Sequence, residues 1–359
     1  MFLALIGAYL TGNIYILIRA LQNLSGLSLG AKIIFSICYG LIAFSLVISL
    51  FFRHAIMPEI LSKSLFTIGS IWLVFTLYMV LFLEAGDLVR LFFPIGKKVF
   101  LIALSCTFCL LAYGYYNYKH PDIHHLDIKL NKLIESPIKV VAVSDVHLGN
   151  GTRKPQLKKI VETINAQKPD LIVISGDLID NSLLPLYQQQ MDEELNQLQA
   201  PLGIYMVPGN HEYISGIKEC KQFLAKTPIQ LLCDTIVTLP NGLQIIGRDD
   251  RSNRHRLTMQ ELMKKADVTK PMLLLDHQPY EIASKDNLGI DIQFSGHTHH
   301  GQVWPLSLLV ENMSEQSHGY RKWPHSHVIV SSGLSLWGPP FRIGTDSDMM
   351  VLNIHADSH

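Results

Sequence analysis

Five short segments in the C-terminal two-thirds of the chain carry side chains that bind divalent cations. Carboxylate and amide oxygens combined with imidazole nitrogens, without cysteine, suit two such cations. Two cations side by side clamp a phosphoryl group and generate hydroxide near neutral pH. The set therefore predicts metal-assisted hydrolysis of phosphate esters. In chain order the segments are Asp145-Val146-His147, Gly176-Asp177, Gly209-Asn210-His211-Glu212, His277 and Gly296-His297-Thr298-His299.

An apolar, strand-like run precedes each of these segments. Helical spacing recurs between the runs, at Gln156–Gln167 and Met191–Leu198. Alternating strands and helices are typical of α/β folds, in which ligands bind beyond the carboxyl ends of the strands. We therefore expect the polar segments to meet at one end of a sheet. The expected strands are Ile138–Ser144, Leu171–Ser175, Gly203–Val207, Gln244–Gly247, Met272–Leu275, Ile292–Ser295, Val328–Ser332 and Met349–Ile354.

The placement of these histidines separates them from the others in the chain. A single histidine is more often a surface residue or a hydrogen-bonded core residue than a metal ligand. Here the whole set follows predicted strands or glycines, which argues for one site. Six other histidines lack such a placement and are expected at the surface: His120, His124, His125, His318, His325 and His327.

The composition divides the 359-residue chain into two parts. Residues 1–115 hold 7 basic and 3 acidic residues, whereas residues 116–359 hold 23 and 27. Fifteen of the 16 histidines lie in the second part. Because the formal net charge is zero, no global field favours nucleic acid, and the second part is slightly acidic. We expect no nucleic-acid partner.

The first part is predicted to be an all-α transmembrane region, residues 1–118. Each of its four long apolar stretches approaches the ~20 residues that an α-helix needs to cross a bilayer. No charged residue lies in the middle of a stretch, so nothing indicates an ion pathway. Basic residues are equally frequent on both sides, which leaves the orientation open. We expect a multi-pass protein of the cell (inner) membrane, with spans at Met1–Ala20, Lys32–Phe52, Leu65–Leu83 and Val99–Tyr115.

The second part resembles the calcineurin-like metallophosphoesterases over residues 137–355. The motifs "DVH", "GDLID", "GNHE", "DH" and "GHTHHGQ" occur in the family's order. The segments "GHTHHGQVWP" and "SSGLSLWGPPFRIG" are similar to the bacterial, membrane-anchored branch. The resemblance implies an α/β fold, a β-sandwich flanked by helices with a two-metal site at one end.

The resemblance also implies roles for individual residues. A hydroxide bridging two cations (Mn, Fe or Zn) would attack phosphorus in line, and His211 would act as general acid or as donor to a phosphoryl oxygen. One cation would be held by Asp145, His147 and His299, the other by Asn210, His277 and His297, with Asp177 bridging the two.

Three residues near the motifs have open interpretations. His300 stands where this branch commonly has glycine, and either touches substrate or is a bystander. Asp276 either orients an imidazole or is a loop carboxylate. Asp180 is expected to cap the following helix, and Glu212 is expected to be structural.

The sequence says less about the substrate. Four arginines, Arg248, Arg251, Arg254 and Arg256, either bind a second phosphate or a headgroup, or form a solvated loop beside Asp249 and Asp250. Late aromatic and apolar residues either form a lip near the bilayer or pack a long loop. They are Trp304, Trp323, Trp337, Pro339, Pro340 and Phe341.

Membrane anchoring together with such a lip favours a phosphodiesterase or pyrophosphatase-like enzyme acting on a lipid-linked or nucleotide-lipid substrate. The alternative is a membrane sensor or scaffold whose phosphoesterase domain is inactive. The intact set of metal-binding side chains argues against that alternative.

Overall fold

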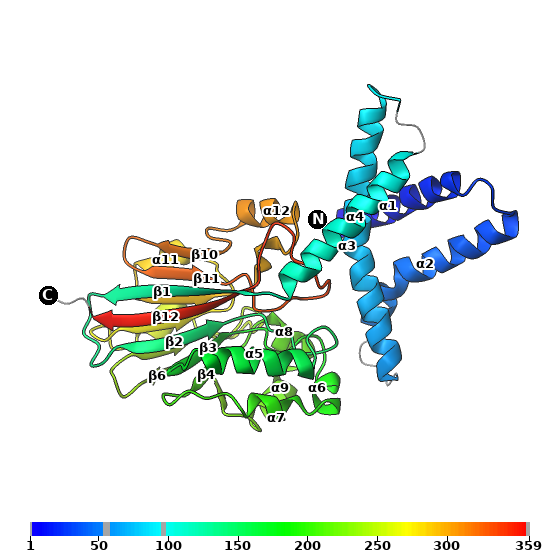
Figure 1. Ribbon diagram of the computed structural model, residues 1–359. Helices are drawn as coiled ribbons and strands as arrows, with labels where there is room; N and C mark the ends of the chain where they lie inside the picture. Colours follow the sequence, from blue (N-terminus) through cyan, green and yellow to red (C-terminus); the bar gives the residue numbers. More distant parts are fainter. Residues whose placement is uncertain (1, 53–57, 95–97, 357–359) are drawn as a thin grey trace. The chain divides into compact units, whose positions relative to one another are not determined.

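The computed structural model describes residues 2–52, 58–94 and 98–356, without the side chains of residues 2–5 and 59 (Figure 1). The chain forms two compact units. One comprises Met1–Tyr116 with Gly338–Phe341, and the other comprises Asn117–Trp337 with Arg342–His359.

The first unit is helical, with α1 (Phe2–Asn23), α2 (Leu29–Phe51), α3 (Glu59–Arg90) and most of α4 (Lys98–Tyr118). Among the described residues, three helices are long and apolar enough to cross a membrane: Leu29–Phe51, Ile60–Arg90 and Lys98–Tyr118. The expectation of four membrane-spanning helices is wrong in this count, because α1 is not one of the three.

Polar residues of α1 contact the neighbouring helices. Asn13 and Arg19 interrupt its apolar sequence, and both find partners on neighbouring helices. Trp72 Nε1 of α3 donates to Asn13 Oδ1 at 2.9 Å, and the Tyr39 hydroxyl of α2 donates to the same oxygen at 3.0 Å. Arg19 pairs with Asp87 of α3 at 2.9 Å. These contacts attach α1 to its neighbours through hydrogen bonds and an ion pair.

The second unit contains two six-stranded sheets. The strand order of the first is β1-β12-β2-β3-β4-β5, and that of the second is β10-β11-β9-β8-β7-β6. The first sheet comprises β1 (Asp122–Leu130), β12 (Asp348–Ala356), β2 (Ile138–Val143), β3 (Leu171–Ser175), β4 (Ile204–Val207) and β5 (Ile229–Leu231). The second comprises β10 (Gly319–Lys322), β11 (His327–Val330), β9 (Ile292–Ser295), β8 (Met272–Leu275), β7 (Gln244–Gly247) and β6 (Thr235–Thr238).

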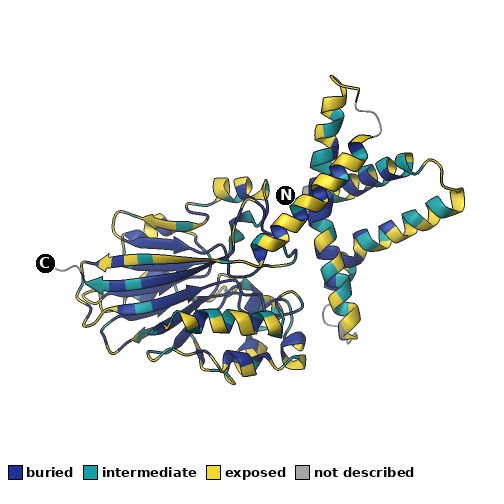
Figure 2. Ribbon diagram, viewed as in Figure 1, coloured by how far each residue is buried: buried dark blue, intermediate teal, exposed yellow. Residues whose placement is uncertain are grey.

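The two sheets face each other across an apolar layer. Val140 and Ala142 of β2 join this layer together with Leu273 of β8 and Phe294 of β9. Val141 of β2, like Val143, packs on the opposite face of the first sheet, since successive side chains of a strand alternate. Burial of the strands on both faces explains why they read as continuous apolar runs (Figure 2).

Helices cover the outer faces of this sandwich. Helix α5 (Lys154–Ala166) buries Leu157, Val161 and Ile164, a helical stripe, against the first sheet. Helices α7 (Met191–Leu195) and α9 (Ile217–Leu224) pack into the same cluster. The remaining helical segments are α6 (Leu184–Gln188), α8 (Asn210–Ser215), α10 (Met259–Met263), α11 (Ile282–Asp286), the 3₁₀ turn η1 (His299–Gly301) and α12 (Leu306–Met313). The expected helix-flanked sandwich is confirmed.

The direction of the strands brings the polar segments to one end. Strands β2, β3 and β4 run parallel in the first sheet, and β7, β8 and β9 run parallel in the second.

The extents predicted for the two domains, residues 1–118 and 137–355, stay predictions. The second unit additionally contains β1, which lies ahead of residue 137 and pairs with β12 along its whole length.

Candidate metal centre

Left-handed backbone conformations just after the strands direct several predicted ligands toward one centre. Asp145, His147, Asp177, His297 and His299 have φ angles of 55°, 49°, 51°, 72° and 48°. Such conformations cost on the order of 1–3 kcal/mol each in a residue that is not glycine. Side chains that alternate simply along a strand would not all point to one place. The strained turns bring them together.

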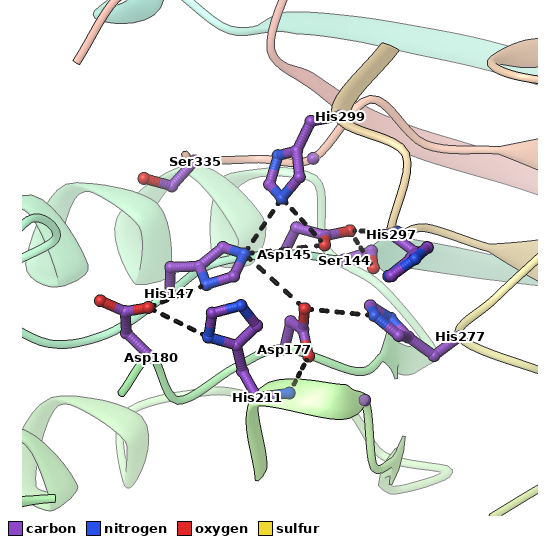
Figure 3. A network of polar contacts seen from close by, with 12 residues as sticks. Ser144, Asp145, His147, Asp177, Asp180, His211, His277, His297, His299 and Ser335 are labelled. Atoms are coloured by element: carbon purple, nitrogen blue, oxygen red, sulfur yellow. Dashed lines mark hydrogen bonds and ion pairs between the residues drawn. The ribbon is translucent and has the colours of Figure 1, made fainter. Parts of the chain in front are cut away.

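One group of ligating atoms comprises Asp145, His147 and His299. The Nε2 atoms of the two histidines lie 3.1 Å apart, and His299 Nε2 lies 3.3 Å from Asp145 Oδ1 (Figure 3). His147 Nε2 is 3.7 Å from the same carboxylate oxygen. Three chain segments that are far apart in the sequence thus converge on one point.

A second group comprises Asp177, His277 and His297. His277 Nε2 lies 3.2 Å from Asp177 Oδ2 and 3.2 Å from Asn210 Oδ1. The rings of His277 and His297 are 5.1 Å apart. Asp177 Oδ2 is also 3.9 Å from His147 Nε2 of the first group. The Asp177 carboxylate therefore lies between the two groups, and all seven predicted ligands are brought together.

Polar atoms without partners show that this arrangement fits bound cations. Within the described part of the chain, the buried Asp145 Oδ1 makes no hydrogen bond, and His299 Nε2 lies 3.3 Å from it. Burial lowers the pKa of His299 to about 3, so this imidazole is neutral and offers a lone pair. Buried oxygens and nitrogens that face one another in this way need a shared positive charge.

The pKa of His147 is shifted in the opposite direction from that of His299. Burial alone would lower its pKa, but the carboxylates of Asp145 and Asp180 raise it to about 10. Without a cation, a proton on His147 therefore supplies part of the missing positive charge. A cation that binds here displaces this proton.

Asp180 lies beside the centre and contacts two imidazoles. Its Oδ1 is 3.2 Å from His211 Nδ1 and 3.5 Å from His147 Nδ1. The expectation that Asp180 caps the next helix is wrong, because α6 begins after Leu183 and has no side-chain cap. The spacing of the two aspartates in "GDLID" was the available signal. Asp180 follows Asp177 by three residues, so a short turn between them places both carboxylates at the centre.

Glu212 fixes the loops that carry the ligands. Its carboxylate accepts backbone N–H groups of Gly209 at 2.7 Å, Ile179 at 2.9 Å and Asp177 at 3.0 Å. A Cβ atom on Gly209 would lie 2.2 Å from Asp177 Oδ1, so only glycine allows this approach. The structural role expected for Glu212 is confirmed.

His277 is oriented by the backbone rather than by its neighbour Asp276. The Ser175 carbonyl lies 2.7 Å from His277 Nδ1, which leaves Nε2 directed at Asp177 and Asn210. Asp276 instead accepts from Lys285 Nζ at 2.6 Å and Arg248 Nη1 at 3.1 Å. The interpretation of Asp276 as a partner of an imidazole is therefore wrong.

Two further residues had no clear role in the sequence. The buried Arg342 donates to the carbonyls of His299, at 2.6 Å, and of Ser332, and so holds the loop that carries His299. His300 Nε2 lies 2.9 Å from Glu311, and its ring stacks on His318 at 3.4 Å. Arg342 lies in the segment "SSGLSLWGPPFRIG", but nothing in that segment indicates its contacts with backbone carbonyls.

Comparison with known proteins identifies the family. A model of the family described as calcineurin-like phosphoesterase matches residues 138–301. A Helicobacter pylori protein named as a metallophosphoesterase is 34% identical over 263 residues, 70% of each chain. One from Campylobacter jejuni is 30% identical over 361 residues, 95% of this chain and 94% of its own.

A relative from Danio rerio is named a transmembrane protein with metallophosphoesterase domain. It is 30% identical over 267 residues, which cover 69% of this chain and 61% of the relative. The sequence similarity and the clustered metal-binding side chains support the same family assignment. The chain belongs to the calcineurin-like metallophosphoesterases, which are metal-dependent phosphoric ester hydrolases.

Proposed function

We propose that this chain is a membrane-bound phosphodiesterase or pyrophosphatase-like hydrolase that uses two divalent cations. The observation that carries the proposal is the position of Asp177, whose Oδ2 faces His277 at 3.2 Å and His147 at 3.9 Å. One cation would be held by Asp145, His147 and His299, the other by Asn210, His277 and His297, with Asp177 shared. Two bound cations supply a hydroxide nucleophile and neutralise phosphoryl oxygens. Oxygen and imidazole donors favour Mn, Fe or Zn.

His211 is the proposed proton donor to the leaving oxygen. Asp180 Oδ1 lies 3.2 Å from His211 Nδ1 and so orients the ring. The His211 ring meets the His147 ring edge to face at 4.6 Å, beside the first group of ligands. Nε2 of His211 remains to donate a proton as the ester bond breaks.

Apolar surface beside His211 supports a lipid-linked or nucleotide-lipid substrate. The ring of Trp337 lies 6.3 Å from that of His211, and Trp337 is 38% exposed. Three helices in the described part of the chain are long and apolar enough to cross a membrane. A membrane-bound enzyme with an exposed aromatic ring beside its centre is suited to substrates that carry an apolar group.

Hydrolysis of bis-p-nitrophenyl phosphate by the detergent-purified chain tests the proposal. We expect activity with added Mn, Fe or Zn, lost in Asp177→Ala and Asn210→Ala and kept in Asp122→Ala, which changes an exposed carboxylate. Lipid-linked diphosphates and phospholipids then test the substrate class. Activity on soluble aryl esters alone would contradict the lipid assignment. Inactivity with every metal, at confirmed metal content, would instead support the sensor or scaffold.

A further inference from the structure

The loop of residues 248–256 follows β7 and lies at the end of the sheet where the candidate centre is found. Strand β7 pairs in parallel with β8, and β8 pairs with β9. The latter two strands lead directly into His277 and His297. Because parallel strands end at the same edge, this arginine-rich loop borders the His277 and His297 side of the centre.

Two of the four arginines in the loop have structural partners. Arg248 Nη1 donates to Asp276 at 3.1 Å. Arg256 Nη1 donates to the Asp249 carbonyl at 3.1 Å and lies 3.9 Å from the Asp276 carboxylate. Both guanidinium groups are largely buried. They stabilise the loop and are not available to a ligand.

Arg251 differs from these two. It is exposed, and its guanidinium carbon lies 4.8 Å from the centre of the Tyr280 ring. The Tyr280 ring in turn lies 6.3 Å from the ring of His297. Within the described ranges, no carboxylate pairs with Arg251. A chain of contacts thus runs from a proposed metal ligand, through an aromatic ring, to a guanidinium group without a counter-ion.

The two acidic neighbours of Arg251 are engaged elsewhere. Asp249 accepts from the Tyr213 hydroxyl at 2.7 Å and from Asn253 at 2.9 Å. Asp250 is 2% exposed and accepts from Gln278 at 2.9 Å. Both carboxylates therefore have hydrogen-bond partners other than Arg251.

We infer that Arg251, resting on Tyr280, binds a second phosphate group of the substrate while the first lies at the metal centre. This inference rests on the proposed function and narrows its substrate to diphosphates or to phosphodiesters that carry another phosphate nearby. The planar guanidinium binds two phosphate oxygens at once. Tyr280 holds the guanidinium by cation–π contact, which reduces the entropy lost when the phosphate binds.

A matched pair of chromogenic substrates tests the subsite. Thymidine 5′-(p-nitrophenyl phosphate) and its 3′-phosphorylated form release the same p-nitrophenolate and differ only in the remote phosphate. We expect the full chain in detergent to prefer the 3′-phosphorylated form in kcat/KM. Arg251→Ala should reduce this preference about 10- to 100-fold, the loss expected for one hydrogen-bonded ion pair. Arg251→Lys should retain part of it.

Control variants separate the subsite from the general charge of the loop. Arg254 is exposed in the same loop, so Arg254→Ala should leave the preference unchanged. Tyr280→Leu should reduce the preference, and Tyr280→Phe, which keeps the ring, should not. An equal fall in Arg251→Ala and Arg254→Ala, or no fall in Arg251→Ala, would overturn the subsite.

Failure of the proposed function would give a different result from failure of the subsite. If the wild-type chain hydrolyses neither ester with any metal, the phosphodiesterase assignment fails. Binding of thymidine 3′,5′-bisphosphate and of thymidine 5′-phosphate to the same variants then decides the subsite. Tighter binding of the bisphosphate that depends on Arg251 would support the subsite, and equal binding would contradict it.

Discussion

At the scale of single residues, the proposed centre combines ligands in left-handed backbone conformations with a further imidazole, that of His211, beside them. His211 approaches Asp180 through Nδ1, and it also forms a third group of possible ligating residues with His147 and Asp177. Its backbone N–H donates to Asp177 Oδ1 at 2.8 Å, so the residue is anchored independently of its side chain. In line with the proposed function, we expect the imidazole to act on substrate rather than to hold a cation.

We predict that His211→Ala lowers kcat by about 10²- to 10⁴-fold on an alkyl phosphodiester, which has a poor leaving group. The loss should be smaller on bis-p-nitrophenyl phosphate, since p-nitrophenolate leaves without a proton. Metal content, measured by plasma mass spectrometry, should match the wild type. Equal losses on both esters would assign His211 to a phosphoryl oxygen instead, and unchanged kcat on both would contradict either role.

At the scale of elements, a buried network joins β8, α11 and the arginine loop. Lys285 of α11 is 2% exposed and donates to Asp276 at 2.6 Å and to the Tyr280 carbonyl at 2.8 Å. Arg248 donates to the same Asp276 carboxylate. This network positions both Tyr280 and the segment that leads into His277.

Lys285→Met should destabilise the chain by about 3 kcal/mol, because removal of one partner leaves a buried carboxylate undercompensated. The expected observation is a thermal midpoint lower by several degrees in scanning calorimetry of the detergent-purified chain. Lys265→Met, at an exposed position, provides the control. A midpoint that Lys285→Met leaves unchanged would show that Arg248 alone neutralises Asp276.

The strands could be predicted from the sequence because burial on both faces leaves apolar runs with polar residues directly after them. Ile138–Ser144 and Leu171–Ser175 correspond to β2 and β3 within one residue. The contacts of Arg342 could not be predicted. They are made with backbone carbonyls far away in the chain, which leave no pattern in the residues themselves.

At the scale of the whole molecule, a helical unit is joined to a metallophosphoesterase unit. Within the part of the chain that the structure describes, three helices rather than the expected four are long and apolar enough to cross a membrane, and α1 is not among them. The polar residues Asn13 and Arg19 of α1 are used for contacts with other helices. The sequence alone does not indicate these partners, Trp72 and Asp87.

We predict that the full chain behaves as an integral membrane protein. Three helices of 23, 31 and 21 residues meet the length that a bilayer requires. After alkaline carbonate washing of membranes, the protein should stay in the pellet and should be released by detergent. Release by carbonate alone would show that the helices lie on the membrane surface or pack within the protein.

Metal stoichiometry tests most directly whether Asp177 lies between two cation sites. The full chain, saturated with Mn or Zn and freed of excess metal, should hold two cations per chain in plasma mass spectrometry. His299→Ala should hold one, and Asp177→Ala should hold fewer than the wild type. A fully active wild type that holds a single cation would contradict the two-metal account.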